Sequence, residues 1–192
     1  MRTYGKALSV VAVAAALSAT LSAATMASPA SAAVTIKMER VYTESVWESM
    51  GIQFTCPPNQ VLTGRSHYGD ERARTTYYCS RILINDEQVQ VHAGDWTSPQ
   101  RESRSDYSAP DHQVIVGRWH QDDENGDTRY RTAALYWQGR QVLLTDGDTS
   151  GEYKESSHSW QAATGKVMTG RVHYGDENSK TWYRFATVSF AG

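Results

Sequence analysis

A stretch of about 15 residues occurs three times in the chain at constant spacing, and it constrains the fold more than any other feature. The copies read GRSHYGDERARTTYY from Gly64, GRWHQDDENGDTRYR from Gly117 and GRVHYGDENSKTWY from Gly170. Each begins 53 residues after the previous one, and they align without gaps. A period of this size is typical of repeat architectures, in which each unit is one supersecondary element.

Each copy has the pattern of a β-hairpin. The segments VLTGRSHY, VIVGRWHQ and VMTGRVHY alternate with period two, as half-buried strands do. Asn125-Gly126 in the second copy is a strong turn signal. The glycine inside each first strand indicates a bend or a close approach of another backbone. A second strand begins at each aligned threonine, namely Thr75, Thr128 and Thr181.

The similarity extends beyond the hairpins. RES at Arg101 matches KES at Lys154, and WES at Trp47 matches with one residue of slippage. QVQVHAGD from Gln88 matches QVLLTDGD from Gln141. Each repeat therefore offers about four short strands. Aromatic residues occupy matching positions before the hairpins, and the aligned tyrosines in the second strands have a spacing that suits core packing: Phe54, Tyr107, Trp160, Tyr77, Tyr130 and Tyr183.

Three equal units predict an all-β domain with a closed, pseudo-threefold, β-prism-like architecture. A β-trefoil is the alternative, although its usual QxW repeat signature is absent. The repeats span about 50–102, 103–155 and 156–192. The third lacks its last element, and shifting Val89 and Val142 back by the period lands on Ile36. We therefore expect residues 33–49 to complete the third repeat and to remove an exposed sheet edge.

Residues 1–32 have the pattern of a secretory signal peptide. Arg2 and Lys6 precede an apolar run, and Ala30-Ser31-Ala32 offers a small-x-small cleavage site. No stop-transfer segment follows, so we expect no membrane span and one secreted domain at 33–192. In an oxidising compartment, Cys56 and Cys79 fit one disulfide that closes a loop of about 23 residues.

Charge and motifs exclude several classes of function. The formal charge is −2, and removal of Arg2 and Lys6 makes it −4, with no basic stripe for nucleic acid. Three similar copies of one polar set do not supply the asymmetric acid, base and nucleophile that catalysis needs. No nucleophile elbow, HExxH or P-loop motif occurs. The sequence therefore predicts a protein that is not an enzyme.

The aligned polar residues of the hairpins are the candidate ligand-binding site. Carboxylates accept hydrogen bonds from sugar hydroxyls, and an aromatic ring packs under the apolar face of a sugar. Three weak sites on one rigid body would gain avidity on a multivalent surface. The predicted ligand-binding residues are His67, Asp70, Glu71, His120, Asp123, Glu124, His173, Asp176 and Glu177, with Trp119, Tyr174 and Trp182 as aromatic partners.

Two other interpretations of this set stay open. The aspartates can cap the turns, Arg65 and its copies can pair with Glu71 and its copies, and the histidines can bond backbone carbonyls, so that the set serves only the hairpin. The His-x-x-Asp-Glu spacing also suits Ca²⁺ or a divalent transition metal without being specific for it. We therefore predict no cofactor, and Ca²⁺ is the candidate that a binding test should include.

The segment CPPNQVLTGRSHYGDERARTTYYC resembles a dermatopontin repeat, with its Cys-Pro, Gln-Val-led strand, polar hairpin, aromatic strand and closing cysteine. Thr-x-Tyr replaces the Asp-Arg-x-Trp that is usual in that family. A weaker similarity is to the vitelline membrane outer layer proteins, which are threefold β-prisms. The resemblance implies a secreted, non-enzymatic protein with lectin-like or extracellular matrix adhesion activity, binding a glycan or a secreted protein. The alternative is an adaptor or structural subunit of a secreted complex such as a toxin particle, with residues 33–49 docking on a partner.

Overall fold

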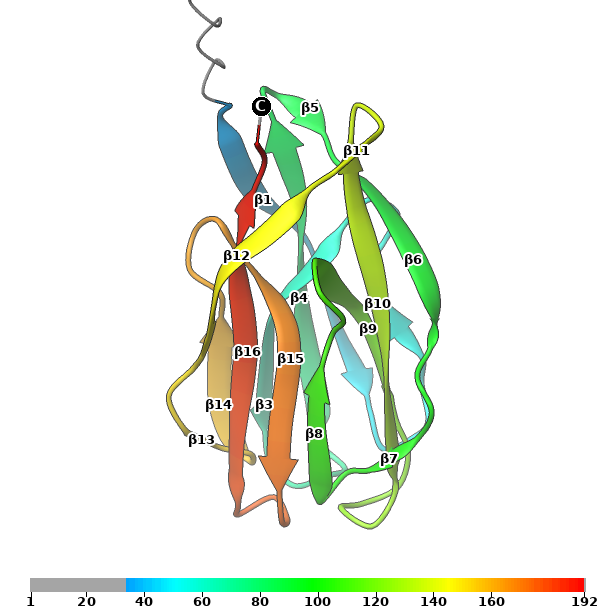
Figure 1. The fold of residues 1–192 in the computed structure, drawn as a ribbon. Helices are drawn as coiled ribbons and strands as arrows, with labels where there is room; N and C mark the ends of the chain where they lie inside the picture. Colours follow the sequence, from blue (N-terminus) through cyan, green and yellow to red (C-terminus); the bar gives the residue numbers. More distant parts are fainter. Residues whose placement is uncertain (1–33, 192) are drawn as a thin grey trace, which may run out of the picture. The chain divides into compact units, whose positions relative to one another are not determined.

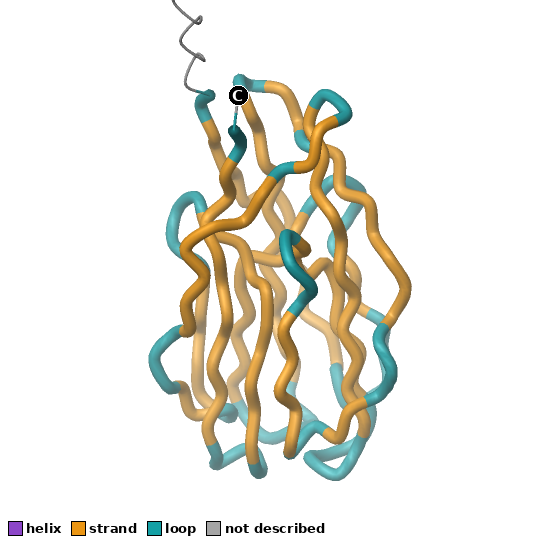
Figure 2. The backbone as a smooth tube through the Cα atoms, viewed as in Figure 1, coloured by secondary structure: helices purple, strands orange, loops and turns teal. Residues whose placement is uncertain are grey.

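The computed structural model describes residues 34–191, and every regular element in that range is a β-strand (Figure 1, Figure 2). The prediction of an all-β domain is therefore confirmed for this part of the chain. The predicted signal peptide lies outside the described residues. Among the described residues, no helix is long and apolar enough to cross a membrane.

Three antiparallel hairpins form the centre of the domain. Their registers match, because His67, His120 and His173 lie opposite Thr75, Thr128 and Thr181. The strand pairs are β3 (Val61–Tyr68) with β4 (Arg74–Ile84), β9 (Gln113–His120) with β10 (Asp127–Trp137), and β15 (Lys166–Tyr174) with β16 (Lys180–Ser189). The three hairpin turns lie at one end of the β domain, opposite the C-terminus (Figure 1).

Each hairpin carries an outer strand on its second strand, supplied by the chain that precedes it. These pairs are β1 (Ile36–Trp47) with β4, β6 (Gln90–Trp96) and β7 (Gln100–Arg101) with β10, and β12 (Leu143–Thr149) and β13 (Tyr153–Lys154) with β16. The short strands β5 (Glu87–Gln88) and β11 (Arg140–Gln141) fold back and pair antiparallel with the ends of β4 and β10.

The pairing of β1 bears on the expectation that residues 33–49 complete the third repeat. Met38 lies opposite Ile82 in β4, so β1 pairs with the hairpin of the first repeat. β6 and β12 likewise pair with the hairpin of the repeat that follows them, so β1 stands to the first hairpin as the segments after Val89 and Val142 stand to the second and third. In every repeat the outer strand comes before the hairpin that it covers. The first and last strands of the described chain meet in the core, because Ile36 and Met38 pack on the cluster that contains Val188 and Phe190.

The other edge of each hairpin takes a strand from a different repeat. These pairs are β14 (Ser157–Gln161) with β3, β2 (Phe54–Thr55) with β9, and β8 (Arg104–Ser108) with β15. The repeats therefore interlock. The edge strand that leads into one hairpin is hydrogen-bonded to the next hairpin around the domain.

The core has an aliphatic and an aromatic part. Val61, Val114 and Val167 are fully buried in the aliphatic cluster. In the aromatic cluster, Tyr77, Tyr130 and Tyr183 are fully buried, as predicted. Each stacks on the aromatic residue of an edge strand, with ring centroids 4.2 Å apart for Phe54–Tyr77 and 4.5 Å apart for Tyr107–Tyr130 and Trp160–Tyr183.

Two predictions about single residues are also confirmed. Cys56 and Cys79 form a disulfide, with Cα atoms 5.8 Å apart. A Cβ atom on any of the strand glycines would lie no more than 2.7 Å from a backbone carbonyl oxygen of the edge strand beside it. These close approaches join Gly64 to Trp160, Gly117 to Phe54 and Gly170 to Tyr107.

Candidate functional site

Six charged side chains form a closed ring where the three hairpins meet. Arginines and glutamates alternate, every arginine contacts two glutamates, and all six are at most 9% exposed. The nitrogen to oxygen distances are 2.7 Å for Arg65–Glu48, 2.8 Å for Arg118–Glu102, 2.6 Å for Arg171–Glu102, 3.0 Å for Arg171–Glu155 and 2.7 Å for Arg65–Glu155. Arg118 and Glu48 complete the ring.

The ring is charged but electrically balanced. Burial by itself would raise the pKa of Glu48, but the positive charges of Arg118 and Arg65 outweigh burial and hold that pKa well below its usual range. The pKa of Glu155 is likewise well below its usual range, because Arg171 and Arg65 outweigh the effect of burial. Burial would lower the pKa of Arg118, but Glu102 and Glu48 raise it well above its usual value. All six groups are therefore ionised at neutral pH, and their charges sum to zero.

The partners of the arginines are not those that the sequence suggested. One open interpretation paired Arg65 with Glu71 across the hairpin, whereas Arg65 contacts Glu48 and Glu155. The three ring glutamates are the central residues of the WES, RES and KES triplets. Those triplets were a usable signal, because a charged residue that recurs at the repeat period needs a repeated partner.

The three predicted histidines are buried beside the ring, with exposed fractions of 4%, 5% and 2% for His67, His120 and His173. His67 Nε2 is 3.0 Å from the carbonyl oxygen of Asp70, and His173 Nε2 is 3.1 Å from that of Gly175. Burial lowers the pKa of all three imidazoles. They are therefore neutral at pH 7 and stabilise their own hairpins.

The predicted aspartates cap the hairpin turns. Asp70 Oδ1 accepts the backbone N–H of Arg72 at 3.0 Å. Asp123 and Asp176 accept the equivalent N–H groups at 2.8 and 3.0 Å. This is the Asx-turn geometry that one of the open interpretations expected. All three aspartates are nevertheless exposed.

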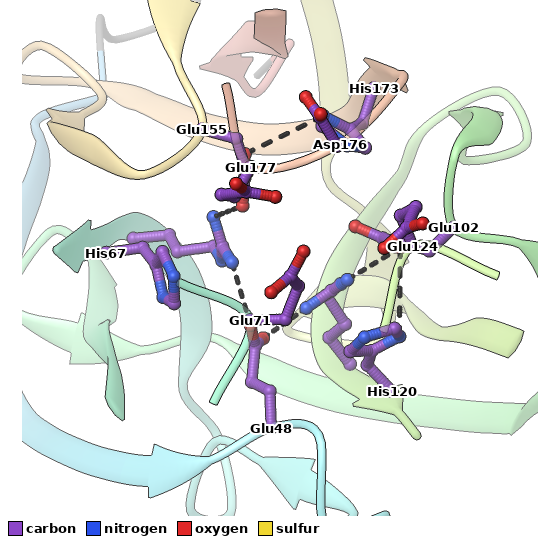
Figure 3. A pocket seen from close by; sticks show the side chains of 12 residues that line it. Glu48, His67, Glu71, Glu102, His120, Glu124, Glu155, His173, Asp176 and Glu177 are labelled. Carbon is purple, nitrogen blue, oxygen red and sulfur yellow. Dashed lines mark hydrogen bonds and ion pairs between the residues drawn. The ribbon is translucent and has the colours of Figure 1, made fainter. Parts of the chain in front are cut away.

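The predicted glutamates of the three repeats come together. Glu71, Glu124 and Glu177 are half-buried and line one cavity of about 30 Å³. Figure 3 shows Glu71 among the ring glutamates, with Glu124 and Glu177 nearby. Burial, together with a hydrogen bond to Glu177, raises the pKa of Glu71 to about 7. The sequence predicted three equivalent sites around the domain, whereas the structure gathers their carboxylates into a single site at the turn end.

The predicted aromatic residues lie apart from this cavity, whose lining among the described residues contains no phenylalanine, tyrosine or tryptophan. Tyr174 is 49% exposed, and its hydroxyl is 3.4 Å from Asp106 Oδ2. Trp119 donates from Nε1 to the carbonyl of Gly51 at 2.8 Å. Trp182 is half-buried in β16. Of these three predicted residues, only Tyr174, at the end of β15, is therefore exposed near the turns.

Two further features lie at the same end. A groove of about 410 Å³ separates the first and second turns and is lined mainly by carboxylates, those of Asp70, Glu71, Asp122, Asp123 and Glu124. Trp47, Met50 and Ile52, in and after the end of β1, have exposed fractions of 43%, 72% and 40%. Sequence patterns did not reveal this apolar segment, because it has no counterpart in the other repeats.

Neither the arrangement of side chains nor the comparison with known proteins supports a metal site or the predicted family. Among residues 34–191, no group of three or more His, Cys, Asp or Glu side chains is arranged to hold a metal ion. No family model matches the chain, and no curated protein or solved structure matches it significantly. The resemblance to dermatopontins and to vitelline membrane outer layer proteins therefore stays a prediction.

Proposed function

We propose that the chain is a secreted, non-enzymatic binding protein whose ligand contacts the turn end of the β domain, with carbohydrate as the leading ligand class. The observation that carries this proposal is the convergence of three half-buried carboxylates, one from each repeat, on one cavity. Tyr68 and Tyr174, 61% and 49% exposed at the ends of β3 and β15, offer aromatic faces beside the turns. Such a surface suits a glycan on a cell or in an extracellular matrix.

Several features support the rest of this proposal. The most strongly polar buried groups are occupied with one another in the ring, and the polar residues around it recur as three similar copies, which does not suit the asymmetric acid, base and nucleophile of an enzyme. The leader pattern and the disulfide suit export to an oxidising compartment. For the architecture, we favour a β-prism over a β-trefoil, because each of the three hairpins is flanked on both edges and the strands, grouped in a ten-stranded and a six-stranded sheet, enclose a shared core.

A glycan array tests this function. The protein from Ala33 to Gly192 is applied at neutral pH, with and without Ca²⁺, beside a variant that carries Glu71→Gln, Glu124→Gln and Glu177→Gln. We expect binding that the triple variant loses and that Glu87→Gln retains, since Glu87 is exposed in β5 at the opposite end (Figure 1). Binding that survives the triple substitution would place the ligand elsewhere.

The second candidate function is an adaptor or structural subunit of a secreted complex. It is favoured by the exposed apolar side chains of Trp47, Met50 and Ile52, which interrupt the similarity among the repeats. An exposed apolar segment of this kind marks a protein contact more often than a sugar site. The adaptor function would be favoured if no glycan on the array binds and if a stable partner is captured from the culture medium by the wild type. A variant with Met50→Ser and Ile52→Ser should then fail to capture that partner.

A further inference from the structure

The cavity at the turn end is lined mainly by hydrogen-bond acceptors. Glu71, Glu124 and Glu177 provide carboxylate oxygens. The guanidinium groups of Arg65 and Arg118, which also line it, are each committed to two ring glutamates. The ring has zero net charge, so the negative charge at the cavity comes from these outer glutamates and from Asp176, which also lines it.

His120 adds a buried acceptor, and it is the independent sign of a ligand. Its side chain is 5% exposed and lines the cavity. Its Nδ1 lies 3.1 Å from the carbonyl oxygen of Asp127, an atom that can only accept, so Nδ1 must carry the proton. Because burial lowers the pKa of this imidazole, Nε2 is unprotonated at neutral pH. Nε2 makes no hydrogen bond to any residue that the structure describes.

The other two repeats show what His120 lacks. His67 and His173 each place Nε2 against a carbonyl oxygen of their own turn. Those turns contain Tyr-Gly, whereas the second turn has Gln121-Asp122; φ is positive at Gly69 and Gly175 and also at Asp122. The changed turn brings no carbonyl to Nε2. Of the three histidines, His120 alone therefore has an Nε2 atom that is free to accept a hydrogen bond from a ligand in the cavity.

The size and polarity of the cavity restrict the group that fits. A volume of about 30 Å³ holds one or two groups the size of water, which excludes a pyranose ring. A hydroxyl donates one hydrogen bond, whereas a primary ammonium donates three and carries the positive charge that adjacent carboxylates attract. Three carboxylates from three matched repeats, with an imidazole beside them, therefore suit an ammonium group best.

We propose that this cavity binds the primary ammonium group of an amino sugar, whose ring lies outside against the turns. The proposal rests on the function proposed above and names the ligand chemistry of the same site. The exposed carboxylates of Asp70, Asp123 and Asp176 can accept from ring hydroxyls at the rim, and Tyr68 and Tyr174 can pack against the sugar face. N-acetylation of the sugar removes the charge and adds bulk, so it prevents this binding.

Calorimetric titration of the mature protein with glucosamine oligosaccharides and with N-acetylglucosamine oligosaccharides of the same length tests the proposal. We expect the free amine to bind at least tenfold more tightly. The triple glutamine variant should lose at least tenfold in affinity for the amine, whereas Glu87→Gln should lose none; melting temperatures verify that both variants are folded. In the ¹⁵N spectrum, the Nε2 resonance of His120 should move on binding.

Each contrary outcome has a distinct meaning. Equal affinity for the free and acetylated oligosaccharides overturns the ammonium site but leaves glycan binding intact. Absence of binding to both oligosaccharides, with a silent array, overturns the site and the proposed function together. Affinity for Nα-acetyl-lysine amide equal to that for glucosamine overturns the assignment to a sugar. A bound amine that leaves the His120 resonance unmoved overturns the role of His120.

Discussion

Six ionised side chains in a protein interior carry a large desolvation cost, and the ring offsets it by giving each charge two opposite neighbours. The same arrangement makes each member hard to replace. Removal of one carboxylate leaves two guanidinium groups buried beside an incomplete set of partners. The ring therefore specifies how the three hairpins meet, more than it adds to net stability.

Glu102→Gln should lower the free energy of unfolding by about 3–5 kcal/mol, because Arg118 and Arg171 each lose a charged partner in the interior. Lys180→Gln is the matched control. It breaks the Lys180–Glu152 pair, whose side chains are 51% and 50% exposed, and should cost less than about 1 kcal/mol. Urea denaturation of both variants measures the difference, and similar small losses would contradict the structural role of the ring.

Glu71 gives stability an unusual dependence on pH. Its folded pKa of about 7 lies above the ordinary value of 4.5, so the folded state binds a proton more tightly than the unfolded chain does. Its contribution is therefore fully present below pH 4.5 and is lost as pH rises through 7. The pKa values of four buried histidines are lowered, so these histidines make the folded state more stable at higher pH. They are His67, His120, His158 and His173, and the pKa of His158 falls to about 4.

The comparison of wild type with Glu71→Gln isolates this effect. The difference in melting temperature between the two proteins should change between pH 5 and pH 8, with the variant gaining relative to wild type at pH 8. There it lacks the repulsion between Glu71 and the carboxylates of Glu177 and Glu124. Differential scanning fluorimetry across this range measures it. A constant difference would show that Glu71 titrates normally.

At the level of elements, one inserted residue accounts for the slippage seen in the sequence. Glu48 precedes Phe54 by six residues, whereas Glu102 precedes Tyr107 by five, and Glu155 precedes Trp160 by five. The structure absorbs the extra residue before β2, where Gly51 has φ of 71° and Met50 bridges to Gln121. As a result, β2 has two residues where β8 and β14 have five. Met50 and Ile52 are exposed as a consequence.

The strand glycines fix how closely an edge strand approaches each hairpin. Gly170→Ala places a methyl group against the carbonyl oxygen of Tyr107, and a backbone atom cannot move aside as a flexible side chain can. We expect a loss of about 1–3 kcal/mol, as for other overpacked sites. Gly151→Ala is the control, since a Cβ there meets nothing within 4 Å, and its stability should change by less than about 1 kcal/mol. Equal effects on the urea midpoint would contradict the close packing.

Local sequence patterns predicted where the strands lie better than they predicted which strands and side chains pair with one another. Alternation and turn residues placed the hairpins, and the recurrence of Tyr77 and its copies indicated core packing, because these signals depend on neighbours in sequence. The pairing of β1 with β4 and the contact of Arg65 with Glu155 join residues far apart in the chain. Period alone states that two segments are equivalent, but not which hairpin each one covers. For the same reason, the sequence did not predict that Glu71, Glu124 and Glu177 line one cavity.

In the whole domain, strand exchange between neighbouring repeats makes three equivalent junctions. At each junction the backbone N–H two residues after the edge aromatic donates to a carbonyl of the hairpin beside it. These bonds are Cys56 to Val116 at 2.8 Å, Ala109 to Thr169 at 2.7 Å and Ala162 to Thr63 at 2.8 Å. Only the first junction has a disulfide, yet all three have the same geometry. The junctions therefore form from packing and backbone hydrogen bonds, and the disulfide is an addition to them.

The double substitution Cys56→Ala and Cys79→Ala should consequently leave a folded protein with lower stability. A bridge across 23 residues reduces the entropy of the unfolded chain, and its loss should cost about 3 kcal/mol. The aromatic stack of Phe54 on Tyr77 and the hydrogen bond to Val116 remain available to hold the junction. Urea denaturation gives the loss, and hydrogen exchange should show that β2 and β9 stay paired. A variant that does not fold would mean that the first junction, with its inserted residue, depends on the covalent link in a way that the other two do not.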